Sequence, residues 1–212
     1  SVGMTVFSFF CVKTSELKDN FFVCEIFCNF AVMSDTILLN GNQIQLTIER
    51  LSREVIESIN FQNTVIIGVQ PRGVLLAEKI HQKILELTGN DIPFGKIDTT
   101  FHRDDFRRGK SLNAKVTEID FHIEEKNVLL IDDVLYTGRT IRAAMDALLS
   151  FGRPLKIELL VLIDRRFNRE LPIQPDFVGN IVDTIEKVDV EVRWAGNENE
   201  KNEVVFIPLS PA

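Results

Sequence analysis

Two adjacent carboxylates stand shortly before a group of small, hydroxyl-bearing residues near the middle of the chain. Asp132 and Asp133 are followed, after a three-residue spacer, by Thr-Gly-Arg-Thr at residues 137–140. Carboxylates accept hydrogen bonds from sugar hydroxyls, and threonine hydroxyls donate to phosphate oxygens. These residue types in this order suit a phosphorylated sugar, with its ribose at the acids and its phosphate at residues 137–140.

The flanking sequence indicates which elements hold these groups. Residues 128–131 are apolar and mostly branched, as in a buried parallel strand, whereas Ile141, Met145 and Leu148 repeat at helical spacing. We therefore expect both acids in a polar turn between a strand and a helix. The first N–H groups of a helix lack internal partners, and its dipole adds about half a positive charge there, so a phosphate binds well. Gly138 lets the main chain approach the phosphate.

A purely structural interpretation is also open for these residues. An Asp at a strand end often only caps a helix, and Thr-Gly is common in turns. We favour the sugar-phosphate site because the strand, the acids, the spacer, the hydroxyl residues and the amphipathic helix follow one another in the required order.

The segment at residues 132–140 resembles the phosphoribosyl diphosphate (PRPP) signature of type I phosphoribosyltransferases. Its sequence, Asp-Asp-Val-Leu-Tyr-Thr-Gly-Arg-Thr, is most similar to the PyrR family, which combines uracil phosphoribosyltransferase activity with attenuation of the pyrimidine operon. The resemblance extends from Asn40 to the C-terminus. It implies the type I fold, an α/β domain with a central, mostly parallel sheet flanked by helices, a small hood and a C-terminal β-hairpin.

The resemblance also implies a reaction and roles for the motif. Uracil and PRPP would give UMP and diphosphate, with Mg²⁺ carried by PRPP and no direct metal site in the protein. Asp132 and Asp133 are expected to orient the ribose and to favour positive charge at its anomeric carbon. The residues expected to bind PRPP are Tyr136, Thr137, Gly138, Arg139 and Thr140. The family further implies a homodimer or a higher homo-oligomer.

A second loop, at Arg72 and Gly73, follows a strand expected at residues 64–69. Loops that leave the carboxyl ends of strands bind ligands in α/β sheets. Arg72 offers a charge-assisted fork to a diphosphate, and Gly73 exposes its backbone N–H. Pro71 and Gly73 equally fit an ordinary turn. The resemblance favours a diphosphate loop, although Pro71 stands where the family usually has Thr.

A polar segment follows the strand expected at residues 92–100 and contains His102, Arg103, Asp104 and Asp105. Charged runs are usually solvated surface segments. In the family the matching stretch begins a mobile loop that closes over PRPP and keeps water from an oxocarbenium-like state. The resemblance therefore implies that Arg103 neutralises charge on the leaving diphosphate.

The nucleobase is expected near the end of a strand at residues 156–163. Residues 171–179 contain two segments that match the part of the family's domain that covers the base. The resemblance implies a base pocket built from Asp164, Arg165, Phe177 and Val178. Aromatic and branched residues there fit a plain core equally well. Elsewhere, helices are expected at residues 43–60 and 74–87, and strands at 188–194 and 204–207 are expected to pair as a hairpin.

Composition limits the class of protein. The 212 residues are 45% hydrophobic, which supports one α/β domain with a real core. The net charge of -7 argues against broad nucleic-acid binding, because phosphate backbones require clustered Lys and Arg. No apolar run approaches the roughly 20 residues of a membrane span, so no membrane contact is expected. The three cysteines all precede Met33 and have no His nearby, which indicates reduced thiols in a cytoplasmic protein.

Regulatory RNA binding is expected to be weak or absent. Where related attenuators have Thr and His beside the Arg of the first helix, this chain has Glu49 and Arg53. Three further positions that are basic or His in those attenuators are Ser58, Asn168 and Asn180. Fewer such side chains weaken contacts with RNA phosphates. An RNA-binding regulator of pyrimidine operon attenuation and a phosphoribosyltransferase for another nucleobase are the alternatives.

Residues 1–32 differ from the rest of the chain. They are rich in Phe, but charged residues interrupt them, which argues against a signal peptide. We interpret residues 1–32 as an N-terminal extension that is non-native or poorly ordered, and residues 33–212 as the phosphoribosyltransferase domain. Met33 is the expected natural start. An intact peptide spanning residues 20–40 in the protein made from its own gene would reject that start, in favour of an extension that packs on the domain or a partner.

Overall fold

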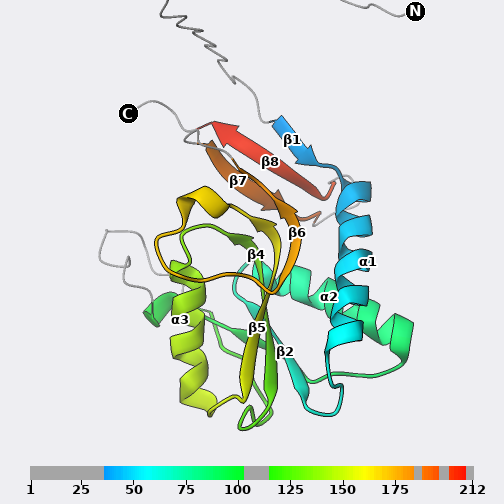
Figure 1. Ribbon diagram of the computed structural model, residues 1–212, viewed down its shortest axis with the longest axis vertical. Helices are drawn as coiled ribbons and strands as arrows, with labels where there is room; N and C mark the ends of the chain where they lie inside the picture. The colour runs from blue at the N-terminus through cyan, green and yellow to red at the C-terminus, as the bar shows by residue number, and fades with distance from the viewer. Residues whose placement is uncertain (1–35, 103–114, 184–187, 196–200, 209–212) are drawn as a thin grey trace, which may run out of the picture. The chain divides into compact units, whose positions relative to one another are not determined.

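Five parallel strands form the central sheet of the computed structural model, in the order β3-β2-β4-β5-β6 (Figure 1). The structure describes residues 36–102, 115–183, 188–195 and 201–208. The strands of this sheet are β2 Thr64–Val69, β3 Phe94–Ile97, β4 Asn127–Leu135, β5 Lys156–Asp164 and β6 Phe177–Ile181. The neighbouring strands β2, β4 and β5 all lie inside the sheet, so their carboxyl ends form one continuous edge.

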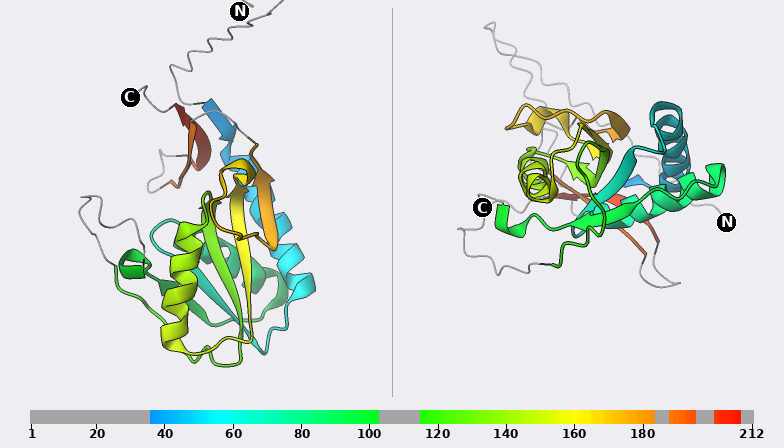
Figure 2. Two further views of the ribbon diagram at one scale, coloured as in Figure 1. Left: turned by 60° about the vertical axis from the view of Figure 1, so that its left-hand side comes forward. Right: turned by 90° about the horizontal axis from the view of Figure 1, so that it is seen from below.

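Helices cover both faces of the central sheet. They are α1 Gly41–Ser58, α2 Gly73–Thr88 and α3 Arg139–Leu148, with 3-10 turns η1 Thr100–His102, η2 Leu149–Phe151 and η3 Arg166–Asn168. Successive side chains of a strand point to opposite faces. Ile66 and Leu129 accordingly belong to the core that includes α1 and α2, whereas Val65 and Leu130 belong to the core that includes α3. Figure 2 shows α3 on the side of the sheet away from α1.

A second, antiparallel sheet has the order β1-β8-β7, with β1 Thr36–Leu39, β7 Val188–Arg193 and β8 Glu203–Pro208. The pairing of β7 with β8 confirms the predicted hairpin. The third strand, β1, was not predicted, and it pairs with β8. Val190 on β7 and Val204 on β8 are buried in the core that contains α1 and α2, so this small sheet packs against that core. Figure 1 shows it at the end of the central sheet where β4 leads into α3. The predicted fold class is confirmed.

The prediction that both acids lie in a turn is wrong. β4 continues through Asp132 and Asp133 and keeps its register with β5, with Asp132 opposite Val161 and Leu135 opposite Asp164. Strand pairing uses backbone N–H and C=O groups, so it does not require apolar side chains at the strand's carboxyl end. The acids are therefore held by the sheet itself, and the turn into α3 begins only after Leu135.

Other observed element boundaries differ from the predicted ones by a few residues. α1 begins earlier than expected because Asn40 and Gln43 form a capping box at its N-terminus. The strand expected at residues 92–100 is the shorter β3. The predicted extension at residues 1–32 lies outside the described residues. In the described part of the chain, no helix combines the length and apolar character needed to cross a membrane.

Candidate active site

The two acids of β4 form the most buried carboxylate pair of the sheet edge. Asp132 and Asp133 are each only 6% exposed. The backbone N–H of Asp133 donates to Asp132 Oδ1 at 2.9 Å, and the N–H of Val134 donates to Asp133 Oδ1 at 2.8 Å. The other oxygen of Asp133, Oδ2, is buried and accepts no hydrogen bond from the described residues. One buried carboxylate oxygen at this edge thus lacks a hydrogen-bond donor among the described residues.

Electrostatics agree with that geometry. Burial raises the pKa of Asp133 above its ordinary value of 3.8, and the positive charge of Arg72 acts against this rise. Arg72 therefore lies close enough to influence Asp133, although the two form no ion pair. A buried carboxylate that lacks a direct cationic partner is costly in an apolar interior, and such groups are frequent at functional sites.

The turn after β4 brings the predicted phosphate-binding residues to the start of α3. Gly138 is the N-cap of α3 with φ +92°, a conformation that favours glycine, and no side chain caps the helix there. The N–H of Arg139 lies 3.4 Å from Thr137 Oγ1. The carbonyl of Thr137 accepts hydrogen bonds from the N–H groups of Glu170 and Leu171 at 3.1 and 3.2 Å. The segment after η3 therefore holds the turn in place through these two hydrogen bonds.

The side chains of this turn point in different directions. Arg139 forms an ion pair with Glu170, with Nη2 2.6 Å from Oε2. The ring of Tyr136 lies over the guanidinium of Arg165, 4.1 Å from its Cζ. Thr140 occupies the second position of α3 and is half-buried. Tyr136, Thr137, Gly138 and Thr140 thus surround the helix start, while Arg139 reaches toward the segment after η3.

The Arg72–Gly73 loop lies directly against the acids of β4. A Cβ on Gly73 would be 2.6 Å from the carbonyl oxygen of Ile131 and 2.9 Å from Asp132 Oδ1, so no side chain fits there. Glycine therefore allows the start of α2 to contact β4. The peptide bond between Gln70 and Pro71 is cis. The loop predicted to bind diphosphate lies against Asp132, on the strand that leads into the predicted phosphate-binding turn.

Arg72 already has an anionic partner in the second sheet. Its Nη2 lies 2.7 Å from Oε1 of Glu191 on β7. Arg193 approaches the other oxygen of the same carboxylate at 3.4 Å. The guanidinium predicted to bind diphosphate is thus held toward β7, near the acids of β4.

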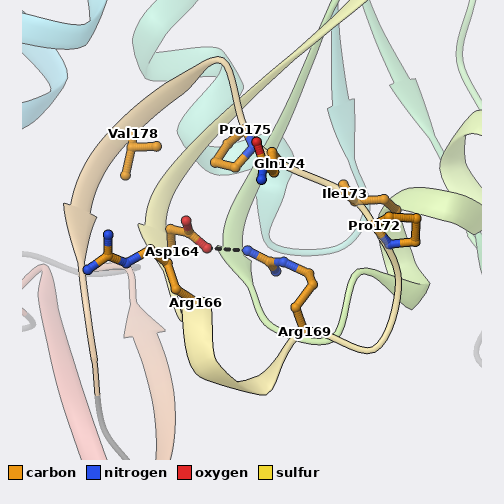
Figure 3. A pocket seen from close by; sticks show the side chains of 8 residues that line it. All are labelled: Asp164, Arg166, Arg169, Pro172, Ile173, Gln174, Pro175 and Val178. Atoms are coloured by element: carbon orange, nitrogen blue, oxygen red, sulfur yellow. Dashed lines mark hydrogen bonds and ion pairs between the residues drawn. The ribbon is translucent and has the colours of Figure 1, made fainter.

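A cavity of about 380 Å³ opens beside the end of β5 (Figure 3). Its lining includes Asp164, Arg166, Arg169, Pro172, Ile173 and Val178. Asp164 Oδ1 accepts a hydrogen bond from Nη2 of Arg169, and Nη1 of Arg169 donates to the carbonyl of Tyr136 at 2.6 Å. Arg169 therefore connects the lining of the cavity to the turn that precedes α3.

Two of the four residues predicted for the base pocket line this cavity, namely Asp164 and Val178. The other two are absent from its lining. Phe177 belongs to the core that contains α1 and α2. Arg165 is buried and binds β7, with Nη2 2.6 Å from the carbonyl of Val188 and Nη1 3.3 Å from Asp189 Oδ1. Phe177 and Val178 are neighbours on β6 and point to opposite faces, and Arg165 lies just beyond the end of β5, so residues adjacent in the sequence were separated in space.

Sequence reasoning missed Arg169 and Arg166. Both follow the end of β5 closely, and charged residues just after a strand end are candidates for a ligand site in a parallel sheet. The predicted loop residue His102 lies exposed in η1, where its carbonyl accepts a hydrogen bond from Arg142 at 3.3 Å. The other loop residues, Arg103, Asp104 and Asp105, lie outside the described residues.

The family profile of the phosphoribosyl transferase domain matches residues 34–195. A hypoxanthine-guanine phosphoribosyltransferase from Bacillus anthracis has a similar fold, with a TM-score of 0.60, 18% identity and coverage of 81% of this chain and 96% of that one. Fold and domain match together define the chain as a phosphoribosyltransferase, an enzyme of the pentosyltransferase class.

The particular family follows from closer relatives. The chain is 47% identical over 175 residues to a bifunctional protein PyrR of Desulfosudis oleivorans, covering 82% of this chain and 97% of the relative. It is 44% identical over 180 residues to a bifunctional protein PyrR of Listeria monocytogenes serotype 4b, covering 82% and 98%. The chain belongs to the PyrR family.

Proposed function

We propose that the protein transfers the phosphoribosyl group of PRPP to uracil, giving UMP and diphosphate. The observation that supports this proposal is the contact of Gly73 with Asp132, because the predicted diphosphate loop lies against one of the two buried acids. PRPP has phosphate groups at two positions of one ribose, and a site for it must hold both ends. The 5-phosphate is assigned to the start of α3 and the diphosphate to the Arg72–Gly73 loop.

The acids between these loops act on the ribose. Asp132 and Asp133 accept hydrogen bonds from its hydroxyls, and their negative charge favours the positive charge that develops at the anomeric carbon as diphosphate departs. Asp133 Oδ2, which has no hydrogen bond from the described residues, is the available acceptor. Catalysis then rests on positioning and electrostatics, and no covalent intermediate with the protein is needed.

Magnesium fits this site as an ion that arrives with PRPP. Among the described residues, no cluster of three or more His, Cys, Asp or Glu side chains is arranged to hold a metal by itself. Mg²⁺ commonly binds through one or two carboxylates together with phosphate oxygens of the substrate. Asp132 and Asp133 would contact the ion that PRPP carries through such carboxylates, and the ion would offset negative charge on the leaving diphosphate.

The acceptor base is assigned to the cavity beside β5. Val178, Pro172 and Ile173 give it apolar surfaces, and Asp164 with Arg169 gives it polar groups. A largely apolar cavity with a few directed polar groups is the usual form of a site for a flat heterocycle.

Diphosphate release from PRPP tests this function. Uracil, hypoxanthine, guanine, xanthine and orotate are supplied in parallel with Mg²⁺, and uracil is expected to give the highest kcat/KM. Release with hypoxanthine or guanine but not with uracil would assign the chain to purine bases instead. Release with none of the five would remove the proposed activity.

We further propose that RNA binding is weak. The first-helix arginines are engaged within the protein, since Arg53 pairs with Glu49 at 2.8 Å and Arg50 pairs with Glu54 at 2.6 Å. Arg50 also donates to the carbonyls of Val178 and Gly179. Neutralised arginines attract RNA phosphates less. Gel-shift titration against the chain's own operon leader is expected to show no tight band, and salt-sensitive, sequence-specific binding would overturn this proposal.

The protein is also proposed to form a homodimer or a larger homo-oligomer, as the PyrR resemblance implies. Sedimentation equilibrium measures this directly, and a single species with the mass of one chain at micromolar concentration would contradict it.

A further inference from the structure

Asp164 and Arg169 form a hydrogen-bonded pair inside the cavity beside β5. Figure 3 shows their side chains pointing toward one another, with the hydrogen bond between them as a dashed line. The side chains are 6% and 16% exposed, so both groups are largely withdrawn from water. Arg169 uses Nη2 for Asp164 Oδ1 and Nη1 for the carbonyl of Tyr136. No described residue donates a hydrogen bond to Asp164 Oδ2.

This pair presents two opposite hydrogen-bonding functions side by side. A guanidinium carries five N–H donors, more than the two bonds of Arg169 consume, and it has no acceptor. Asp164 Oδ2 is an acceptor, and it lies beside the guanidinium that donates to Oδ1 of the same carboxylate. A flat ring lying between Val178 and Ile173 therefore meets a donor next to an acceptor.

Nucleobases fall into two groups by the order of the hydrogen-bond donors and acceptors that they would present to this pair. Uracil and the lactam purines present a carbonyl oxygen beside a ring N–H, which complements a donor beside an acceptor. Cytosine and adenine present an amino group beside an unprotonated ring nitrogen, which is the opposite order. A buried polar site rejects a mismatched ligand strongly, because its own groups are left unpaired.

We propose that Asp164 and Arg169 read the edge of the acceptor base and select bases in which a carbonyl stands beside a ring N–H. This inference rests on the proposed phosphoribosyl transfer and names the part of the site that distinguishes keto from amino bases. Arg169 is in addition a positioning residue, because it joins the base cavity to the turn before α3 through Tyr136. Discrimination between one-ring and two-ring bases is a separate matter of cavity size.

The first test compares bases on the unaltered protein. Uracil with cytosine and hypoxanthine with adenine are assayed as acceptors, and each is also tested as a competitor of uracil. Within both pairs the keto base is expected to be favoured by at least about 100-fold in kcat/KM or inhibition constant. Equal competition by cytosine and uracil would overturn the proposal without any variant.

The second test uses Asp164→Asn, which replaces an obligate acceptor by an amide that can also donate. The ratio of kcat/KM for uracil to that for cytosine is expected to fall at least tenfold, while the KM for PRPP changes little. The matched control is Asp189→Asn, which removes a carboxylate from another arginine, Arg165, outside the cavity. Its uracil-to-cytosine ratio is expected to equal that of the unaltered protein.

Arg169→Lys and Arg169→Met distinguish a loss of base selectivity from a general loss of folding or activity. Lys keeps one charged donor and is expected to restore part of the uracil preference that Met loses. An unchanged ratio in Asp164→Asn with turnover retained would overturn this inference and leave the proposed function intact. Absence of diphosphate release from the unaltered protein with every base would instead remove the proposed function, and this inference with it.

Discussion

Asp133 and Asp164 are both buried carboxylates at the carboxyl ends of neighbouring strands, but their surroundings differ. Asp164 ends β5 and shares a hydrogen bond with the guanidinium of Arg169. Asp133 lies near the end of β4, has a buried oxygen without a hydrogen bond from the described residues, and has a pKa raised by burial. Asp164 is 5% exposed and Asp133 is 6% exposed, so burial alone does not distinguish the two acids.

The difference indicates how each site is used. The charge of Asp164 is balanced within the protein, so its cavity is organised before a ligand arrives. The charge of Asp133 is only partly offset by Arg72, and a ligand with hydroxyls or a bound cation supplies what is missing. We therefore expect that removing the partner of Asp164 lowers folding stability, whereas removing the charge of Asp133 raises it.

The largest expected effect is on the stability of the Asp164 site. Arg169→Met removes the partner of a buried charge, which typically lowers the free energy of unfolding by about 3 kcal/mol. Urea unfolding followed by fluorescence of Trp194, the only tryptophan in the chain, measures this. Arg53→Met, which breaks the exposed pair with Glu49, is the control and is expected to change stability by less than about 1 kcal/mol. Equal losses in both variants would contradict a preorganised site.

Turnover should depend most on the other acid. Asp133→Asn removes the charge that stabilises the developing positive centre, and we expect kcat/KM for PRPP to fall about 100-fold. Steady-state diphosphate release provides the measurement. Asp91→Asn, an exposed carboxylate beside His81, serves as control. Unaltered activity in Asp133→Asn would remove that residue from the site.

The same substitution should stabilise the ligand-free protein. Because burial raises the folded-state pKa of Asp133 above 3.8, the ionised carboxylate destabilises the fold at neutral pH. Asp133→Asn is expected to raise the free energy of unfolding by about 1 kcal/mol at pH 7. Protonation relieves this penalty as the pH falls through the raised pKa toward 3.8, so the two stability curves converge there. A less stable variant at pH 7 would show that Asp133 is satisfied in the fold.

The smallest expected effect concerns Arg72, whose positive charge acts on Asp133 and which forms an ion pair with Glu191. Glu191 occupies its guanidinium, so diphosphate must compete with this carboxylate. Glu191→Gln is expected to tighten diphosphate binding about twofold, the scale of one partly exposed ion pair. Isothermal titration calorimetry measures the dissociation constant. Glu203→Gln removes a charge from the same sheet without touching Arg72, and a matching gain in that variant would point to general electrostatics.

Much of the central sheet could be predicted because its strands are continuous apolar runs. β2 and β5 matched their apolar segments closely. β4 was predicted too short, since carboxylates are atypical of buried strands, although backbone pairing with β5 continues past them. β1 was missed because Thr36–Leu39 is only four residues long and owes its structure to pairing with the distant β8.

The candidate site could be predicted where the chemistry lies within one segment. The acids and the Thr-Gly-Arg-Thr residues are local, so their order alone was enough to predict a sugar-phosphate site. Arg169 could not be found this way, because its partners Asp164 and Tyr136 become neighbours only through packing of the segment after η3. For the same reason Arg165 was grouped with Asp164, although its guanidinium binds β7 instead.

Arg165 has a mechanical consequence for the molecule. It is buried, it binds the carbonyl of Val188 at the start of β7, and its guanidinium lies beneath the ring of Tyr136. The Arg165 side chain thus connects the C-terminal hairpin to the turn that precedes α3. A tilt of that hairpin, whether from a mutation or from a molecule bound to its outer surface, is therefore expected to shift the turn that we propose binds the 5-phosphate.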